Sequence, residues 1–151
     1  MKVIYGDLVQ LAADGEFDLI VHGCNCFCTM GAGIAKSIKA EFPEAFHADC
    51  MTTKGDVKKL GQFSYAEVRR LDKHVTVVNA YTQYHWRGKG VLVDYDAVRA
   101  AFVQIKKAFP GKSIGYPKIG AGLAGGDWAI ISDIINKTLL GERHCLVAYD
   151  R

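Results

Sequence analysis

Two glycine-rich loops constrain this sequence more than any other feature. Residues 30–34 read MGAGI and residues 119–123 read IGAGL, and each loop stands between a short apolar run and an amphipathic stretch. Glycine lets a backbone approach a ligand closely, and the start of a helix aims free N–H groups at anions. We therefore expect both loops at the carboxyl ends of strands in an open α/β sheet, holding a ligand with a diphosphate between them. The alternative is that both loops are only tight turns.

A dinucleotide-binding fingerprint is the obvious reading of the second loop, because Gly120, Gly122 and Gly125 fit G-x-G-x-x-G. That fingerprint belongs to a first βαβ unit and needs an acidic residue about 20 residues later. After Gly125 the chain has room for one helix and one strand, so this reading fails. A P-loop over residues 106–113 fails as well: it has the expected end, Gly111-Lys112-Ser113, but Lys106 stands where its first glycine belongs.

Hydrophobic periodicity predicts alternating strands and helices along the whole chain. Pro43 ends the first long helix and begins the next, and Asp94 is a predicted helix N-cap. The expected strands are 3–5, 19–21, 63–68, 75–80, 113–116 and 145–149, and the expected helices start near residues 33, 43, 95 and 128. This pattern predicts an α/β fold of three layers, α-β-α, with a mixed and roughly six-stranded sheet.

Length and composition favour a single domain over residues 1–151 of ordinary globular character. The formal net charge of +3 suits a small anionic ligand better than duplex nucleic acid. No apolar run approaches the roughly 18 residues of a membrane span, so we expect no membrane association. The first residues run directly into a predicted strand, so we expect no signal peptide and a cytoplasmic location.

Five cysteines, three of them at positions 24, 26 and 28, form a poor disulfide framework. A zinc site with His22 is disfavoured, since structural zinc sites use C-x₂₋₄-C pairs with a second pair elsewhere. A catalytic cysteine is disfavoured too, because only His22 offers a neighbouring base. We expect neither a metal nor a cofactor.

Four short motifs, in order along the chain, resemble the macrodomain family of ADP-ribose-binding proteins. They are Gly6-Asp7-Leu8, the stretch HGCN at residues 22–25, GAGI at residues 31–34, and PKIGAGL at residues 117–123. The resemblance covers essentially the whole chain and implies a mixed six-stranded sheet between helices. Its variant is similar to the branch of terminal ADP-ribose glycohydrolases, DNA-linked ADP-ribose glycohydrolases and ADP-ribose 1''-phosphate phosphatases.

The resemblance implies a binding role for fourteen residues. Asp7 would accept a hydrogen bond from the adenine amino group, although it also suits the cap of a short helix. Asn25 would face the distal ribose, the two glycine loops would cover the diphosphate, and Tyr149 would flank the adenine unless it is a core residue. The full predicted set is Asp7, Leu8, Asn25, Gly31, Ala32, Gly33, Ile34, Gln83, Gly120, Ala121, Gly122, Leu123, Ala124 and Tyr149.

The chemistry implied by the resemblance is hydrolysis, with three alternatives open. Glycohydrolases of this branch use a lysine and an aspartate where this chain has Gln83 and Ala124, which disfavours a lysine adduct. Phosphatases of the branch carry a histidine at the place of His22, so His22 is the predicted acid or base on ADP-ribose 1''-phosphate. The alternative is that His22 is a partly buried histidine at a strand end. Asp127 would orient water or His22, or else cap a helix. A reader of ADP-ribose without turnover is the third alternative.

Residues 85–89 read HWRGK and form a basic, aromatic segment. Tryptophan and arginine together suit stacking on bases and contact with phosphate. A similar segment lies near the substrate in DNA-linked members of the family. Nucleic acid, or another ADP-ribosylated macromolecule, is therefore an open partner beside the small ligand.

Overall fold

A six-stranded sheet of order β1-β6-β5-β2-β4-β3 organises the computed structural model, which describes residues 1–149. All neighbouring strands are parallel except β3, which runs antiparallel to β4 at one edge. The strands are β1 (Lys2–Tyr5), β2 (Leu19–Cys24), β3 (Phe63–Arg70), β4 (Lys73–Tyr81), β5 (Ile114–Tyr116) and β6 (His144–Ala148).

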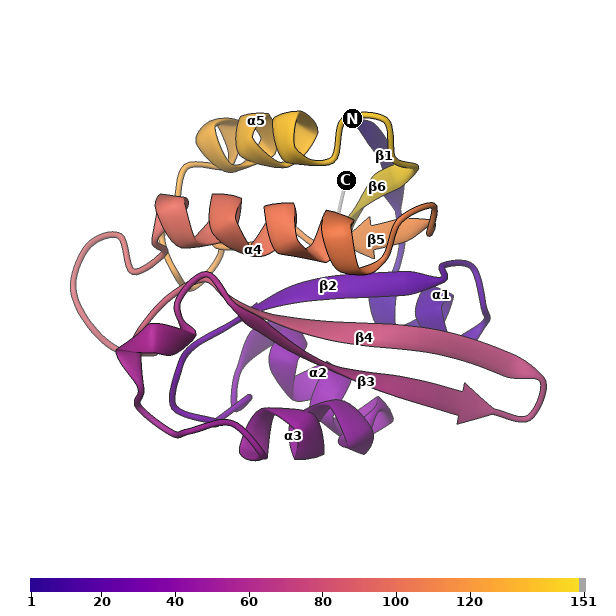
Figure 1. The fold of residues 1–151 in the computed structure, drawn as a ribbon, viewed down its shortest axis with the longest axis horizontal. Helices are drawn as coiled ribbons and strands as arrows, with labels where there is room; N and C mark the ends of the chain where they lie inside the picture. Colours follow the sequence, from indigo (N-terminus) through magenta and orange to yellow (C-terminus); the bar gives the residue numbers. More distant parts are fainter. Residues whose placement is uncertain (150–151) are drawn as a thin grey trace.

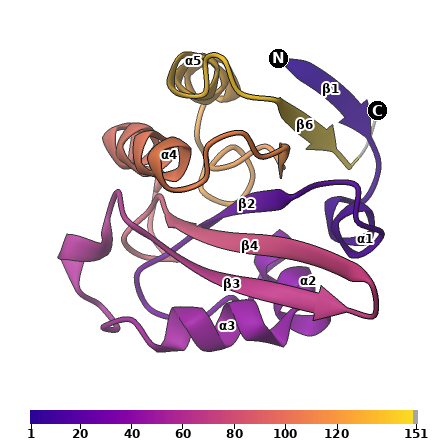
Figure 2. The same cartoon turned by 45° about the vertical axis from the view of Figure 1, so that its right-hand side comes forward.

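Helices cover both faces of this sheet, with α4 and α5 on one side and α1, α2 and α3 on the other (Figures 1 and 2). The helices are α1 (Leu8–Ala13), α2 (Gly33–Glu41), α3 (Pro43–Cys50), the 3₁₀ turn η1 (Val57–Lys59), α4 (Tyr95–Ala108) and α5 (Trp128–Thr138). The predicted α/β fold of three layers with a mixed six-stranded sheet is confirmed. Within residues 1–149, no helix combines the length and apolarity that crossing a membrane requires.

Each face of the sheet carries its own hydrophobic core. Along β2 the side chains alternate, so that Leu19 and Val21 join the core under α4 and α5, while Ile20 joins the core under α1, α2 and α3. All three side chains are fully buried. Burial on both faces explains why the strand reads as a continuous apolar run, which is typical of parallel sheets covered by helices.

The helix starts differ in a way that matters for the site. The side chains of Asp7, Asp94 and Asp127 accept hydrogen bonds from backbone N–H groups and cap α1, α4 and α5. Helix α3 starts with Pro43 in its first turn, as predicted. Helix α2 instead has Ala32 at its N-cap, and a methyl group cannot accept a hydrogen bond. The N–H groups at the start of α2 are therefore left for another partner.

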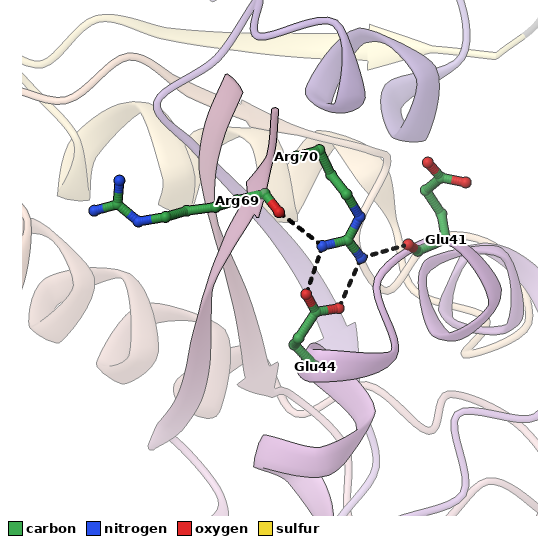
Figure 3. A network of polar contacts seen from close by, with 4 residues as sticks. All are labelled: Glu41, Glu44, Arg69 and Arg70. Atoms are coloured by element: carbon green, nitrogen blue, oxygen red, sulfur yellow. Dashed lines mark hydrogen bonds and ion pairs between the residues drawn. The ribbon is translucent and has the colours of Figure 1, made fainter. Parts of the chain in front are cut away.

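A polar network joins the end of β3 to the junction of α2 and α3 (Figure 3). The guanidinium of Arg70 donates to both carboxylate oxygens of Glu44 at 2.6 and 2.9 Å. It also donates to the backbone carbonyls of Arg69 and Glu41. The hydrogen bond from Arg70 lowers the pKa of Glu44. The fork links the first turn of α3 to the end of β3, and α3 carries a residue of the site.

Hydrophobic periodicity did not predict two short helical elements, α1 and η1. Helix α1 has six residues and η1 has three, which is too short for a recurring apolar face to stand out. Helix α1 agrees with the alternative role of Asp7 as a cap. Strand β6 ends at Ala148, so Tyr149 follows the strand rather than closing it.

Candidate functional site

The two glycine loops meet at one edge of the sheet. The first follows β2 and the second follows β5, and these strands are parallel neighbours. Their carboxyl ends therefore lie at the same edge, where α/β sheets bind ligands. The loops face each other closely, since a Cβ atom on Gly33 would lie 3.8 Å from Cδ1 of Leu123.

A cavity of about 490 Å³ opens between the two loops. Most of its wall is backbone and small side chains, which lets a ligand come close to the peptide N–H groups. Its lining residues are Gly23, Cys24, Asn25, Thr29, Met30, Gly31, Ala32, Gly33, Ile34, Ala35, Asp49, Gln83, Trp86, Pro117, Lys118, Ile119, Gly120, Gly122, Leu123 and Ala124.

A second cavity of about 540 Å³ lies beside the first, toward α1 and the end of β6. Four residues line both cavities: Gly33, Ile34, Pro117 and Lys118. The two cavities therefore lie side by side at this edge of the sheet, and we refer to them together as the groove. The other lining residues of the second cavity are Gly6, Asp7, Leu8, Val9, Ser37, Val147, Ala148 and Tyr149.

The middle of the groove is built to attract an anion. Helix α2 starts there without a side-chain cap, so the N–H groups of its first turn lack intrahelical partners. Across the groove, the N–H groups of Gly122 and Leu123 make no hydrogen bond to any residue in the described part of the chain. Lys118 lines both cavities and brings a positive charge to this part of the groove. Unpaired donors and a helix N-terminus together favour negative charge.

The α1 end of the groove carries an aspartate and an exposed aromatic ring. Oδ1 of Asp7 accepts hydrogen bonds from the N–H groups of Val9 and Gln10, at 3.0 and 3.2 Å. The second oxygen, Oδ2, is left for another donor. Tyr149 is 83% exposed, so it is not a core residue, while Leu8 is buried against the sheet.

The opposite end of the groove is polar and aromatic. The amide oxygen of Asn25 accepts from the N–H of Phe27, and its nitrogen donates to Thr29 Oγ1 at 2.8 Å. The Gln83 amide donates to the carbonyl of His85 at 2.9 Å. Trp86, which is 43% exposed, forms part of the wall. The predicted residues Asn25 and Gln83 are thus brought together here.

His22 does not line either cavity. Its imidazole is wholly buried, Nε2 lies 2.6 Å from Oδ1 of Asn79, and Cys24 Sγ lies 3.6 Å away. Burial lowers the pKa of His22 to about 4. The expectation that His22 acts directly on a ligand does not agree with this placement, because a neutral and enclosed imidazole has no path to the groove.

Asp127 and Ala121 also lie outside the lining of the groove. The Asp127 side chain accepts from the N–H of Ala129 at 2.9 Å and caps α5, which was the alternative prediction for it. The methyl group of Ala121 packs against the core under α4 and α5. The other predicted site residues line one cavity or both.

The cysteines near the groove are neutral thiols. Burial raises the pKa of Cys24 strongly and that of Cys26 to about 11. A thiol must ionise to act as a nucleophile or to bind zinc. Within residues 1–149, no three His, Cys, Asp or Glu side chains are grouped so that they could hold a metal ion.

Asp49 is the site residue that the sequence patterns did not single out. It lies on α3, lines the first cavity and is 1% exposed. Phe42, Ala45 and Asp49 are spaced three and four residues apart, and all three are buried. An acid at an apolar position of a helix was a signal in the sequence, because carboxylates are rarely buried without a role.

Comparison with known families decides the classification of this chain. The family described as Macro domain matches residues 21–135. The chain belongs to the macro domain family. An uncharacterized 17.5 kDa protein of Enterobacteria phage T4 is 37% identical to this macro domain over 141 residues, which are 90% of this chain and 88% of the phage protein. An ADP-ribose 1''-phosphate phosphatase of Aspergillus oryzae is 40% identical over 57 residues, 36% of this chain and 27% of that protein.

Solved macrodomains share the fold of this macro domain. The macrodomain of Mycobacterium tuberculosis DarG superposes with a TM-score of 0.76 at 21% identity, covering 99% of this chain and 98% of that one. A Trypanosoma brucei macrodomain solved in complex with ADP-ribose gives a TM-score of 0.67 at 17% identity, covering 99% of this chain and 64% of that one. At these identities the likeness concerns the fold alone.

Proposed function

We propose that this macro domain binds ADP-ribose 1''-phosphate, or a related ADP-ribose derivative, along the groove and releases the 1''-phosphate by hydrolysis. One observation carries the binding proposal: the uncapped start of α2 faces the unpaired N–H groups of Gly122 and Leu123 across the middle of the groove. A diphosphate supplies the acceptors that these donors lack. The macrodomain solved with ADP-ribose and the partial match to a phosphatase support the choice of ligand.

The two ends of the groove suit the two ends of that ligand. The free Oδ2 of Asp7 accepts a hydrogen bond from the adenine amino group, while exposed Tyr149 packs beside the base. The distal ribose and its phosphate then lie among Asn25, Gln83 and Trp86. Because Gln83 and Ala124 replace a lysine and an aspartate, attack by a lysine on the ribose plays no part.

A second candidate function is removal of ADP-ribose from a macromolecule. The observation in its favour is Trp86, which lines the first cavity and stacks on His85 with ring centroids 4.1 Å apart. The Arg87 guanidinium lies 5.7 Å from the Trp86 ring centre. An exposed indole ring beside a cation suits a nucleobase or another flat group attached to the ribose.

Calorimetric titration with ADP-ribose, followed by a phosphate-release assay on the 1''-phosphate form, tests the proposal. We expect saturable binding and phosphate release by the same sample. Binding without phosphate release, but with loss of label from an ADP-ribosylated oligonucleotide or protein, would favour the second candidate. Binding without any turnover would leave a reader of ADP-ribose. Absence of binding would refute the anion cradle itself.

A further inference from the structure

The geometry points to Asp49 as the residue that takes the proton from the attacking water, a role that rests on the proposed phosphatase function. Asp49 and Lys118 are the charged side chains that line the first cavity, and Lys118 also lines the second cavity. Asp49 is therefore the carboxylate of the cavity that receives the distal phosphate.

One oxygen of Asp49 is fixed and the other is free. The Tyr81 hydroxyl donates to Oδ1 at 2.7 Å. Oδ2 makes no hydrogen bond to the described residues, and it is not among their fully buried, unpaired side-chain atoms, where only Thr82 Oγ1 is found. Part of Oδ2 is therefore open, and because Asp49 lines the first cavity, a water molecule there can donate to it. A fixed carboxylate with one open oxygen is the arrangement that a general base requires.

A chain of buried hydrogen bonds holds Tyr81 toward Asp49. The Ser64 hydroxyl lies 2.7 Å from the Tyr81 oxygen, and the Asn79 amide nitrogen donates to Ser64 Oγ at 3.0 Å. Asn79 Oδ1 in turn lies 2.6 Å from His22 Nε2. Each of these groups donates a hydrogen bond to the next one, so the chain starts at Nε2 of His22 and ends on the Asp49 carboxylate. His22 is thus a positioning residue that acts through Asn79, Ser64 and Tyr81.

Charged and titratable groups face Asp49 from several elements. Lys59 of η1 donates to the Cys26 carbonyl at 3.1 Å, and its ammonium lies 4.5 Å from the centre of the Tyr81 ring. The thiols of Cys24 and Cys26 lie near enough to interact with the Asp49 charge, the Cys28 thiol donates to the Asp49 carbonyl at 3.2 Å, and Cys50 follows Asp49 on α3. Burial raises the pKa of Asp49, while the Tyr81 hydrogen bond and the charge of Lys59 act in the opposite direction. A raised pKa brings a carboxylate closer to the strength of a useful base.

The bonds and protons of the hydrolysis balance with Asp49 as the single base. Oδ2 of ionised Asp49 takes a proton from water while the water oxygen bonds to the phosphorus of the 1''-phosphate. The bond between phosphorus and O1'' of the ribose breaks, and its electron pair stays on O1''. O1'' takes a proton from solvent and Asp49 returns its proton to solvent, so that ADP-ribose and inorganic phosphate form and the carboxylate is restored.

The Asp49→Asn variant tests this role, because asparagine keeps an acceptor for Tyr81 and cannot take the proton. We expect phosphate release to fall about 100-fold or more, the typical contribution of a general base. The Kd for ADP-ribose should stay within about threefold, since the diphosphate cradle is intact. Asp94→Asn is the matched control: Asp94 caps α4, lines neither cavity and is replaced by another good cap.

The pH dependence of turnover separates a positioning role from a merely structural one. Tyr81→Phe removes the bond that favours ionised Asp49, so the acid limb of kcat against pH should move to higher pH. An equal fall in kcat at every pH would contradict the positioning role of Tyr81 and of the hydrogen-bonded chain behind it. Wild-type phosphate release that persists in a folded Asp49→Asn variant would overturn the role of Asp49 and leave the proposed function standing. A wild type that releases no phosphate would refute the proposed function, and the role of Asp49 with it.

Discussion

Nε2 of His22 lies 2.6 Å from Oδ1 of Asn79, and both side chains are wholly buried. The Asn79 amide nitrogen donates to the Ala45 carbonyl and to Ser64 Oγ, so its oxygen is left as the acceptor. His22 must then carry its proton on Nε2 and stay neutral. The histidine belongs to the buried network beneath the groove rather than to its wall.

This relationship predicts a loss of stability at mildly acidic pH. The pKa of His22 is lowered from 6.5 to about 4, so between these values the unfolded chain binds a proton that the native chain does not. The contribution of neutral His22 to the free energy of unfolding is complete above pH 6.5 and is lost as pH falls toward 4. At about 1.4 kcal/mol per pH unit, the loss is on the order of 3 kcal/mol.

Urea unfolding of the wild type and of His22→Gln at pH 7.5 and pH 5 measures this loss. Glutamine retains a donor for Asn79 and does not titrate, so we expect the variant to lose much less stability on acidification. The two proteins must be compared because the raised pKa of Asp49 stabilises the fold on acidification in both of them. The difference between their losses of stability isolates the effect of His22. Equal acid sensitivity in both proteins would contradict a buried, neutral His22.

Asp127 is predicted to matter for stability and not for turnover. Replacing it with alanine removes the acceptor for the Ala129 N–H and should cost about 1 kcal/mol of unfolding free energy. Asp127→Ser should recover most of that loss, because serine is also a good cap. Phosphate release at 25 °C should be close to wild type in both variants. A large drop in kcat for a folded Asp127→Ser variant would show that Asp127 takes part in the reaction.

Asp7 has two separable roles, and matched variants distinguish them. Asp7→Ser keeps a helix cap but withdraws the carboxylate from the groove, so thermal stability should change little while ADP-ribose affinity falls about tenfold. The hypoxanthine analogue of ADP-ribose offers a carbonyl in place of the adenine amino group. Its affinity should be low for the wild type and nearly unchanged by Asp7→Ser. A loss of affinity for both ligands alike would mean that Asp7 shapes the loop and does not read the base.

The layered fold could be predicted from local signals. Pro43 marks a helix start by its fixed φ, and Asp94 marks one by its cap, and both helices begin where expected. The apolar runs that became β2 and β4 are unusual for half-exposed strands, which indicated burial on both faces. The opposed glycine loops followed from the rule that parallel strands share an edge for their carboxyl ends.

The wall of the groove could not be predicted in the same way. His22 stands beside the glycine loop in sequence, but its side chain turns toward Asn79, which is its partner in the register of β2 and β4 and lies 57 residues away. Asp49 reaches the cavity from a helix that packs on β3. Both placements depend on strand pairing and helix docking, which no short motif encodes.

Gly122 gives the most direct test of the groove as a ligand site. A Cβ atom added there meets no protein atom within 4 Å, so Gly122→Val should change the free energy of unfolding by less than about 0.5 kcal/mol. The added side chain instead occupies the space that the diphosphate needs. Calorimetry should show a fall in ADP-ribose affinity of about tenfold or more, or about 1.4 kcal/mol. Gly122→Ala should give a smaller fall, in step with its smaller side chain. A Val variant that binds like the wild type would place the ligand elsewhere, because a backbone cradle cannot accept a branched side chain at its contact point.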